Sequence, residues 1–235
     1  LSVLSISLNN SLGEPDWEIL ARILPHINSK IKLQLVGDDI ETTEGMRAFA
    51  RAIQGHPAIT HFRSVVSFEN TATFCSALTT LPNLECAIVT QQRPGREGVI
   101  RFPESMTEFL RAPSLRVVKF RYFCFASSLC LATAMALRQG SSITSLVLDQ
   151  CSFPEGGSEQ IASALKENAT LTTFEISPSH DSIDEAFYDA MAASLLSNSK
   201  LQDLSIRYNG ASSPTSVCRV PASYTHLTLP TRYSV

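Results

Sequence analysis

The chain has 235 residues, of which 44% are apolar and 17% are charged, and its formal net charge is −3 at pH 7. This composition is typical of a globular protein and excludes a disordered one, and the slight acidity argues against nucleic acid or an anionic membrane as a partner. The longest apolar stretch, Val117 to Phe125, is interrupted by Lys119 and Arg121, so none approaches the roughly 18–20 apolar residues of a membrane-spanning helix.

A short apolar pattern, apolar-x-x-apolar-x-apolar, returns along the whole chain. Its clean copies are Leu1-Leu4-Ile6, Ile143-Leu146-Leu148, Leu171-Phe174-Ile176 and Leu201-Leu204-Ile206, and weaker copies begin at Lys30, Ile59, Leu84 and Leu115. Successive copies start at residues 1, 30, 59, 84, 115, 143, 171 and 201, so the steps are 25 to 31 residues. A period in this range predicts a solenoid, in which each unit buries its apolar face against its neighbours.

A second apolar register lies six residues before each later start. It consists of Leu24, Ile53, Leu78, Phe109, Leu137, Leu165 and Leu195. Most of these residues have a large apolar partner four positions earlier, with Ser105 and Thr133 as the exceptions. An i, i+4 apolar pair is typical of a helix that packs one stripe onto a core. The register predicts helices near residues 17–26, 43–54, 71–80, 104–111, 128–138, 157–167 and 184–196.

Local signals support these helices. Ser158 and Asp184 stand where a short polar side chain can accept hydrogen bonds from the first turn of a helix. Gly55 and Gly140 follow apolar runs and are expected to end two of the helices. Because alternate residues of a strand point to opposite faces, each Leu-x-Leu pattern is expected to form a strand with its apolar residues inward. Each unit is therefore predicted to be strand, turn, helix and turn.

The repeats resemble leucine-rich repeats of the ribonuclease-inhibitor type, best over Ile143 to Thr170. That family places Asn or Cys at the ninth position of each unit, and Asn9, Cys151 and Asn209 match it, with Asp38 as a substitute. Four units depart from the pattern, with Ser67, Gln92, Phe123 and Ser179 at this position. The resemblance covers residues 1–210 and implies an α/β horseshoe of about eight strands and seven helices. Its parallel sheet would line the concave side and its helices the convex side.

The C-terminal end of the sequence does not continue the repeat. Residues 211–235 include Ser223 to Thr231, SYTHLTLPT, which resembles the in-frame translation of a transposase-type sequencing adapter. We therefore expect residues 211–235 to be a non-native or disordered tail. The chain opens on Leu1, within a strand pattern, so we expect an internal fragment of a longer repeat protein.

No residue pattern indicates catalysis or a cofactor. The six cysteines include no Cys-x-x-Cys pair, the five histidines are scattered over different units, and the glycines at 95, 98, 156 and 157 lack phosphate-loop spacing. The sequence therefore predicts no enzyme, with no catalytic, cofactor-binding or metal-binding residue. Free buried thiols suit a reducing compartment, so a cytoplasmic location is expected.

The outward strand positions are the candidate binding surface. Arg207 is among these positions, and the charged residues singled out as the candidate site are Lys32, His61, Arg63, Lys119, Arg121, Asp149, Glu175 and Asp203. Such a face predicts a scaffold that binds a protein partner of mixed charge, with no nucleic acid, membrane or small-molecule substrate. A GTPase-activating protein of the same repeat type, acting on a small GTPase, is the alternative.

Overall fold

The computed structural model describes residues 3–8, 14–35, 43–66, 71–91, 105–179 and 183–207. The strands are β1 (Val3–Leu8), β2 (Lys30–Leu35), β3 (Ile59–Val66), β4 (Cys86–Gln91), β5 (Val117–Arg121), β6 (Ser145–Cys151), β7 (Thr173–Pro178) and β8 (Asp203–Ile206). The helices are α1 (Glu14–Ile23), α2 (Thr43–Ile53), α3 (Thr71–Thr79), α4 (Ser105–Leu110), α5 (Ser127–Arg138), α6 (Gly157–Ala164) and α7 (Glu185–Leu195), and a 3-10 helix, η1 (Leu24–His26), follows α1.

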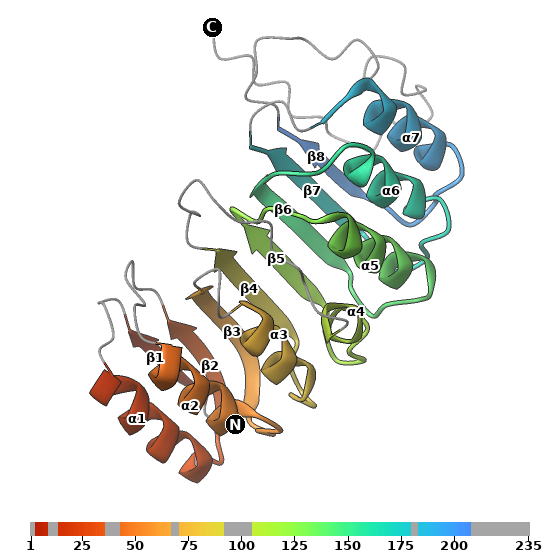
Figure 1. Ribbon diagram of the computed structural model, residues 1–235. Helices are drawn as coiled ribbons and strands as arrows, with labels where there is room; N and C mark the ends of the chain where they lie inside the picture. The colour runs from red at the N-terminus through yellow and green to blue at the C-terminus, as the bar shows by residue number, and fades with distance from the viewer. Residues whose placement is uncertain are drawn as a thin grey trace, which may run out of the picture.

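The strands form one open parallel sheet in sequence order, and the helices cover one of its faces (Figure 1). Neighbouring strands lie about 4.8 Å apart, whereas packed helices need about 8–10 Å between their axes. The helix layer therefore follows the longer, outer arc, and the sheet lines the inner side of a horseshoe-like solenoid. This is the fold that the repeat predicts. Within the described ranges, no helix has the length and apolarity needed to cross a membrane.

Strand pairing follows the expected register along most of each ladder from β2 onward, with local shifts where Ile31 pairs with Ile59 and Cys151 with Pro178. His61 lies opposite Cys86, Cys86 opposite Val117, and Thr173 opposite Asp203. The first pair departs from the prediction, because Leu4 pairs with Ile31 where the unit starts place it opposite Leu33. Strand β2 carries apolar residues at 31, 33 and 35, so a shift of two residues keeps apolar side chains on the same face. The apolar pattern alone cannot distinguish these two registers.

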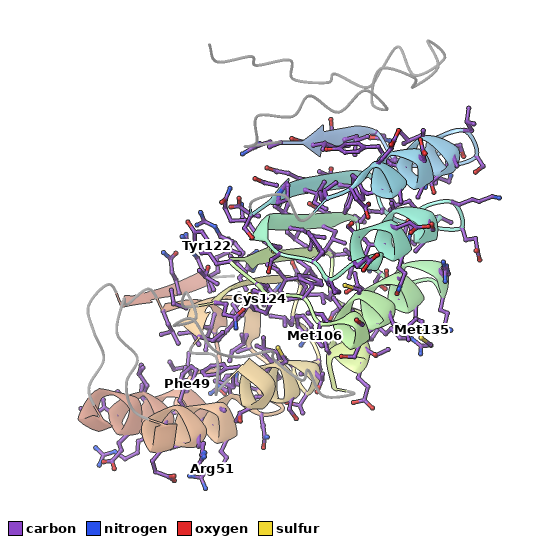
Figure 2. All side chains as sticks on the ribbon, turned by 45° about the horizontal axis from the view of Figure 1, so that its top comes forward. Phe49, Arg51, Met106, Tyr122, Cys124 and Met135 are labelled. Atoms are coloured by element: carbon purple, nitrogen blue, oxygen red, sulfur yellow. The ribbon has the colours of Figure 1, made fainter. Side chains whose placement is uncertain are left out.

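The core lies between the sheet and the helices. All seven residues of the helix register, Leu24 to Leu195, are buried, as are the inward strand residues Leu146 and Phe174. Thr133, an exception in the apolar pattern, is also buried, and its hydroxyl donates to the Leu129 carbonyl at 2.8 Å. The side chains drawn in Figure 2 fill the space between the two layers.

Helix boundaries agree with the sequence to within a few residues. Asp184 caps α7, since its carboxylate accepts a hydrogen bond from the Phe187 N–H at 3.1 Å. Ser158 is not a cap as expected: it lies inside α6, and the cap position is Gly156, at φ +69°. Helix α6 also ends at Ala164 rather than 167, because the chain tightens there into turns such as Asn168 N–H to Leu165 O.

The loop after β5 explains why Phe123 departs from the family pattern. Its ring is buried, with its centroid 4.9 Å from that of Phe120. Backbone bonds to the next unit replace the missing polar side chain: Ser152 N–H donates to Phe123 O, and Phe125 N–H donates to Ser152 O. In that next unit Cys151 is buried, with its Sγ 3.6 Å from the Phe120 carbonyl. The ninth positions 9, 38, 67, 92 and 209, and the tail 211–235, lie outside the described residues.

Candidate protein-binding surface

The sheet face opposite the helices, here called the concave face, carries all eight charged residues that the sequence singled out. Strand pairing arranges the outward side chains in rows. One row contains Lys32, His61, Cys86, Val117, Ser145, Thr173 and Asp203. The next contains Gln34, Arg63, Ile88, Lys119, Val147, Glu175 and Ser205. A third row brings Arg121 opposite Asp149. The structure therefore places these residues on a single surface.

In the C-terminal half of this face, charges are paired across strands. The Asp149 carboxylate accepts a hydrogen bond from Arg121 Nε at 2.9 Å, and Lys119 Nζ lies 3.6 Å from the same oxygen. One unit further on, Arg207 Nη2 lies 2.6 Å from Glu175 Oε1. We call these five residues the paired half. Their ionic groups satisfy one another, so each has less capacity for a partner.

The N-terminal half is different. Lys32, His61 and Arg63, here called the basic corner, form no ion pair with any other described residue. Lys32 is exposed, and His61 and Arg63 are half-buried. The five basic residues expected on this face therefore fall into two groups, because Lys119 and Arg121 belong to the paired half. Asp203, at the far end, likewise has no ion-pair partner among the described residues.

Half-buried apolar side chains adjoin the basic corner. Ile88 pairs with Arg63 across the β3–β4 ladder, and Val117 is the neighbour of Cys86 in the row that contains His61. Val65 follows Arg63 on the same face of β3 and is also half-buried. A charged edge beside partly exposed apolar groups is the composition that protein interfaces use for orientation and affinity.

Hydrogen bonding determines the state of the His61 ring. The Thr60 hydroxyl donates to the Ile31 carbonyl at 3.3 Å, so its oxygen accepts from His61 Nδ1 at 3.0 Å. We therefore assign the proton to Nδ1, which leaves Nε2 as the open acceptor of the neutral ring. Burial, and then the positive charge of Lys32, lower the pKa of His61. An anion bound at this position would oppose both effects.

The cysteines among the described residues do not form a reactive centre. Cys86 lies opposite His61 on the neighbouring strand, but burial raises the pKa of its thiol, which disfavours the nucleophilic thiolate. Burial also raises the pKa of Cys75 and of Cys130 to about 12. Within the part of the chain that the structure describes, no cluster of His, Cys, Asp and Glu could hold a metal ion.

The sequence did not indicate Tyr122 as a member of this surface, and it placed Arg207 at an outward position without including it among the candidate residues. Arg207 occupies the seventh position of its unit and pairs with Glu175 at the fifth position of the preceding one. Tyr122 follows β5 at φ +58°, and the Arg121 guanidinium lies 5.5 Å from its ring centroid. Figure 2 shows Tyr122 beyond the end of β5, whereas Arg51 and Met135 lie on the outer side of the helices. Aligning the units position by position reveals the Glu175–Arg207 diagonal, but nothing in the sequence indicates the left-handed Tyr122.

Geometry and chemistry together define a parallel α/β repeat solenoid with an open, charged sheet face. No protein-family model matches the chain, and no curated protein matches it either.

Proposed function

We propose that this chain is a protein-interaction scaffold, built of leucine-rich repeats of the ribonuclease-inhibitor type, that binds a protein partner through its concave face without chemical turnover. The repeat pattern and the recurring strand–turn–helix unit support the family assignment. A cytoplasmic location is part of the proposal, and it is supported by the buried free thiols Cys75, Cys130 and Cys151.

The observation that carries the proposal is the uncompensated basic corner beside Ile88 and Val117. A solvated sheet face with no binding role gains most from charges that pair or disperse, as they do around Asp149. Unpaired cations beside partly exposed apolar groups instead provide a site that a complementary partner can neutralise and cover. Nothing in the described residues favours the GTPase-activating alternative, so we do not propose it.

Position-specific photocrosslinking tests the proposal. A photoreactive residue would replace Ile88 on the concave face in one variant and Leu131, an exposed residue of α5, in a control variant. We expect the Ile88 variant to crosslink one protein in a native extract and the Leu131 variant not to. The purified protein should then bind the parent chain and compete with the crosslink. Crosslinking from Leu131 alone would move the interface to the helices and contradict the proposal.

A further inference from the structure

We infer that the basic corner binds an acidic segment of the partner protein. This segment is extended, carries carboxylates at alternate positions next to an apolar residue, and binds with uptake of a proton at His61. This inference rests on the proposed function and adds the chemistry of the partner.

The charge distribution of the concave face favours an acidic partner. In the paired half, Lys119, Arg121 and Arg207 are matched by Asp149 and Glu175. At the basic corner, Lys32 and Arg63 have no such match among the described residues, and Glu85 is the one acidic group acting on His61. An acidic segment at the basic corner supplies the opposite charge that is missing there, whereas a basic segment meets repulsion. The same segment gains less at the paired half, where each cation already has an ion-pair partner.

The spacing of the cations suggests the form of the segment. Lys32 and His61 are neighbours in one row, and Arg63 lies two residues further along the same strand as His61. Diagonal neighbours in a sheet are about 7–8 Å apart, and alternate residues of an extended chain are about 6.6 Å apart. Carboxylates at i and i+2 of an extended segment therefore match Lys32 and Arg63. An apolar side chain beyond them would reach Ile88 or Val117.

His61 couples this binding to pH. Its Nδ1 proton is held by Thr60, so the open Nε2 can take a proton without breaking a hydrogen bond. The charged groups that act on the ring are Lys30 and Lys32 from β2 and Glu85 beside β4. Cys86, opposite the ring, stays protonated because burial raises its pKa. A bound carboxylate stabilises the imidazolium, so binding should strengthen as pH falls from 8 to 6.

The test uses a defined probe, a labelled peptide of about ten residues with glutamate at alternate positions and a leucine after the last glutamate. A length of about ten residues spans the three strands β2–β4 of the basic corner. One control peptide replaces every glutamate with glutamine, and a second carries the same glutamates side by side. Affinity is measured by fluorescence anisotropy at low and high salt and at pH 6 and 8. We expect the alternating peptide to bind at least about tenfold tighter than the glutamine peptide at low salt, with the difference shrinking at high salt.

Two variants locate the site. The double variant K32E and R63E should abolish the preference for the glutamate peptide. Its matched control, R111E and K166E, makes the same charge change at exposed residues next to helices α4 and α6 and should leave the preference unchanged. H61Q should keep the affinity measured at pH 8 but lose the gain at pH 6. Calorimetry in two buffers of different ionisation enthalpy should detect proton uptake in the parent chain and none in H61Q.

The outcomes separate this inference from the proposed function. Equal binding of the glutamate and glutamine peptides, or an equal loss in the R111E and K166E control, would overturn the acidic partner while leaving concave-face crosslinking intact. A single-stranded oligonucleotide that displaces the peptide at equal charge would also overturn it and assign the surface to nucleic acid. Loss of the Ile88 crosslink, by contrast, would overturn the proposed function itself.

Discussion

The two ends of the array meet the same structural requirement with different side chains. Three residues before their strand patterns, Asn168 and Asn198 accept from the backbone N–H groups two and three residues on, and donate to Leu137 O and Leu165 O of the preceding unit. In the N-terminal half, His56 stands at this position. Its Nδ1 accepts from the Ala58 N–H at 3.2 Å, and its Nε2 donates to Leu24 O at 2.8 Å.

The comparison shows that an amide and an imidazole can fill the same role at this position, as an acceptor for the following turn and a donor to the end of the previous helix. Other units do without such a side chain, because Ile27, Leu81, Ala112 and Gly140 stand at the same position. The junctions at His56, Asn168 and Asn198 therefore use the same hydrogen bonds. The concave face differs between the two halves, because the C-terminal units pair most of their charges across strands and the basic corner leaves its charges available.

The largest effect is expected from the core that both halves share. Leu146→Ala should lower the free energy of unfolding by about 2–5 kcal/mol, because a fully buried leucine leaves a cavity. Hydrogen exchange should show the loss of protection concentrated in β5 to β7, since solenoid contacts are between neighbours. Leu131→Ala, at a half-exposed site on α5, is the control and should change stability by less than about 0.5 kcal/mol. Uniform loss of protection from β1 to β8 would contradict this view of the array.

The asparagine junction comes next in size. Asn198→Ala should cost about 1–3 kcal/mol, because the N–H groups of Lys200 and Leu201 lose their acceptor and Leu165 O keeps only its bond from the Asn168 N–H. Asn83→Ala is a matched control, since its exposed side chain donates one hydrogen bond, to Pro57 O. Chemical denaturation of both variants measures the difference. Equal losses would mean that the junction hydrogen bonds do not stabilise the array.

Exchanging the two junction types tests their equivalence directly. His56→Ala should cost about 1–3 kcal/mol, since the Ala58 N–H loses its acceptor and Leu24 O keeps only its bond from the Ile27 N–H. His56→Asn should recover at least half of that loss, because an amide offers the same acceptor and donor at this position in the C-terminal units. Thermal unfolding of the two variants, side by side, gives the measurement. If Asn is as damaging as Ala, the imidazole is required for its shape and the two junctions are not equivalent.

The sequence predicts the architecture well, because burial of a periodic apolar pattern leaves few alternatives. Periodic apolar residues such as Leu146, Phe174 and Leu165 determine the spacing of the strands, the position of the helices and the face of each element that points inward. The register of β1 on β2 expected from the unit starts was wrong, because Ile31, Leu33 and Leu35 allow two equally apolar alignments. The role of His56 was missed for a related reason. Nothing in composition or spacing separates a histidine that bonds two backbone groups from one that lies on the surface.

The candidate surface was predicted only in part. Alternation along each strand places all eight charged residues on the concave face, but it does not predict which of them form ion pairs across strands. Asp149 contacts Lys119 and Arg121 because the 28-residue step between the two units puts Arg121 opposite Asp149. The division into a basic corner and a paired half therefore depends on register and on side-chain conformation. Both follow from the three-dimensional packing of the units rather than from any single repeat.

The smallest effect on stability should come from a substitution that makes the paired half more like the basic corner. Asp149→Asn removes the partner of Arg121 and Lys119, and the free energy of unfolding should fall by only about 1 kcal/mol, because all three side chains keep contact with water. The freed cations would then resemble the basic corner. In the K32E and R63E background, Asp149→Asn should therefore restore part of the binding of the alternating glutamate peptide, measured by anisotropy at low salt. Asp189→Asn, at an exposed site on α7, makes the same charge change and should restore none. No rescue by Asp149→Asn would mean that Lys32 and Arg63 act through their particular geometry beside Ile88, and not through unpaired positive charge alone.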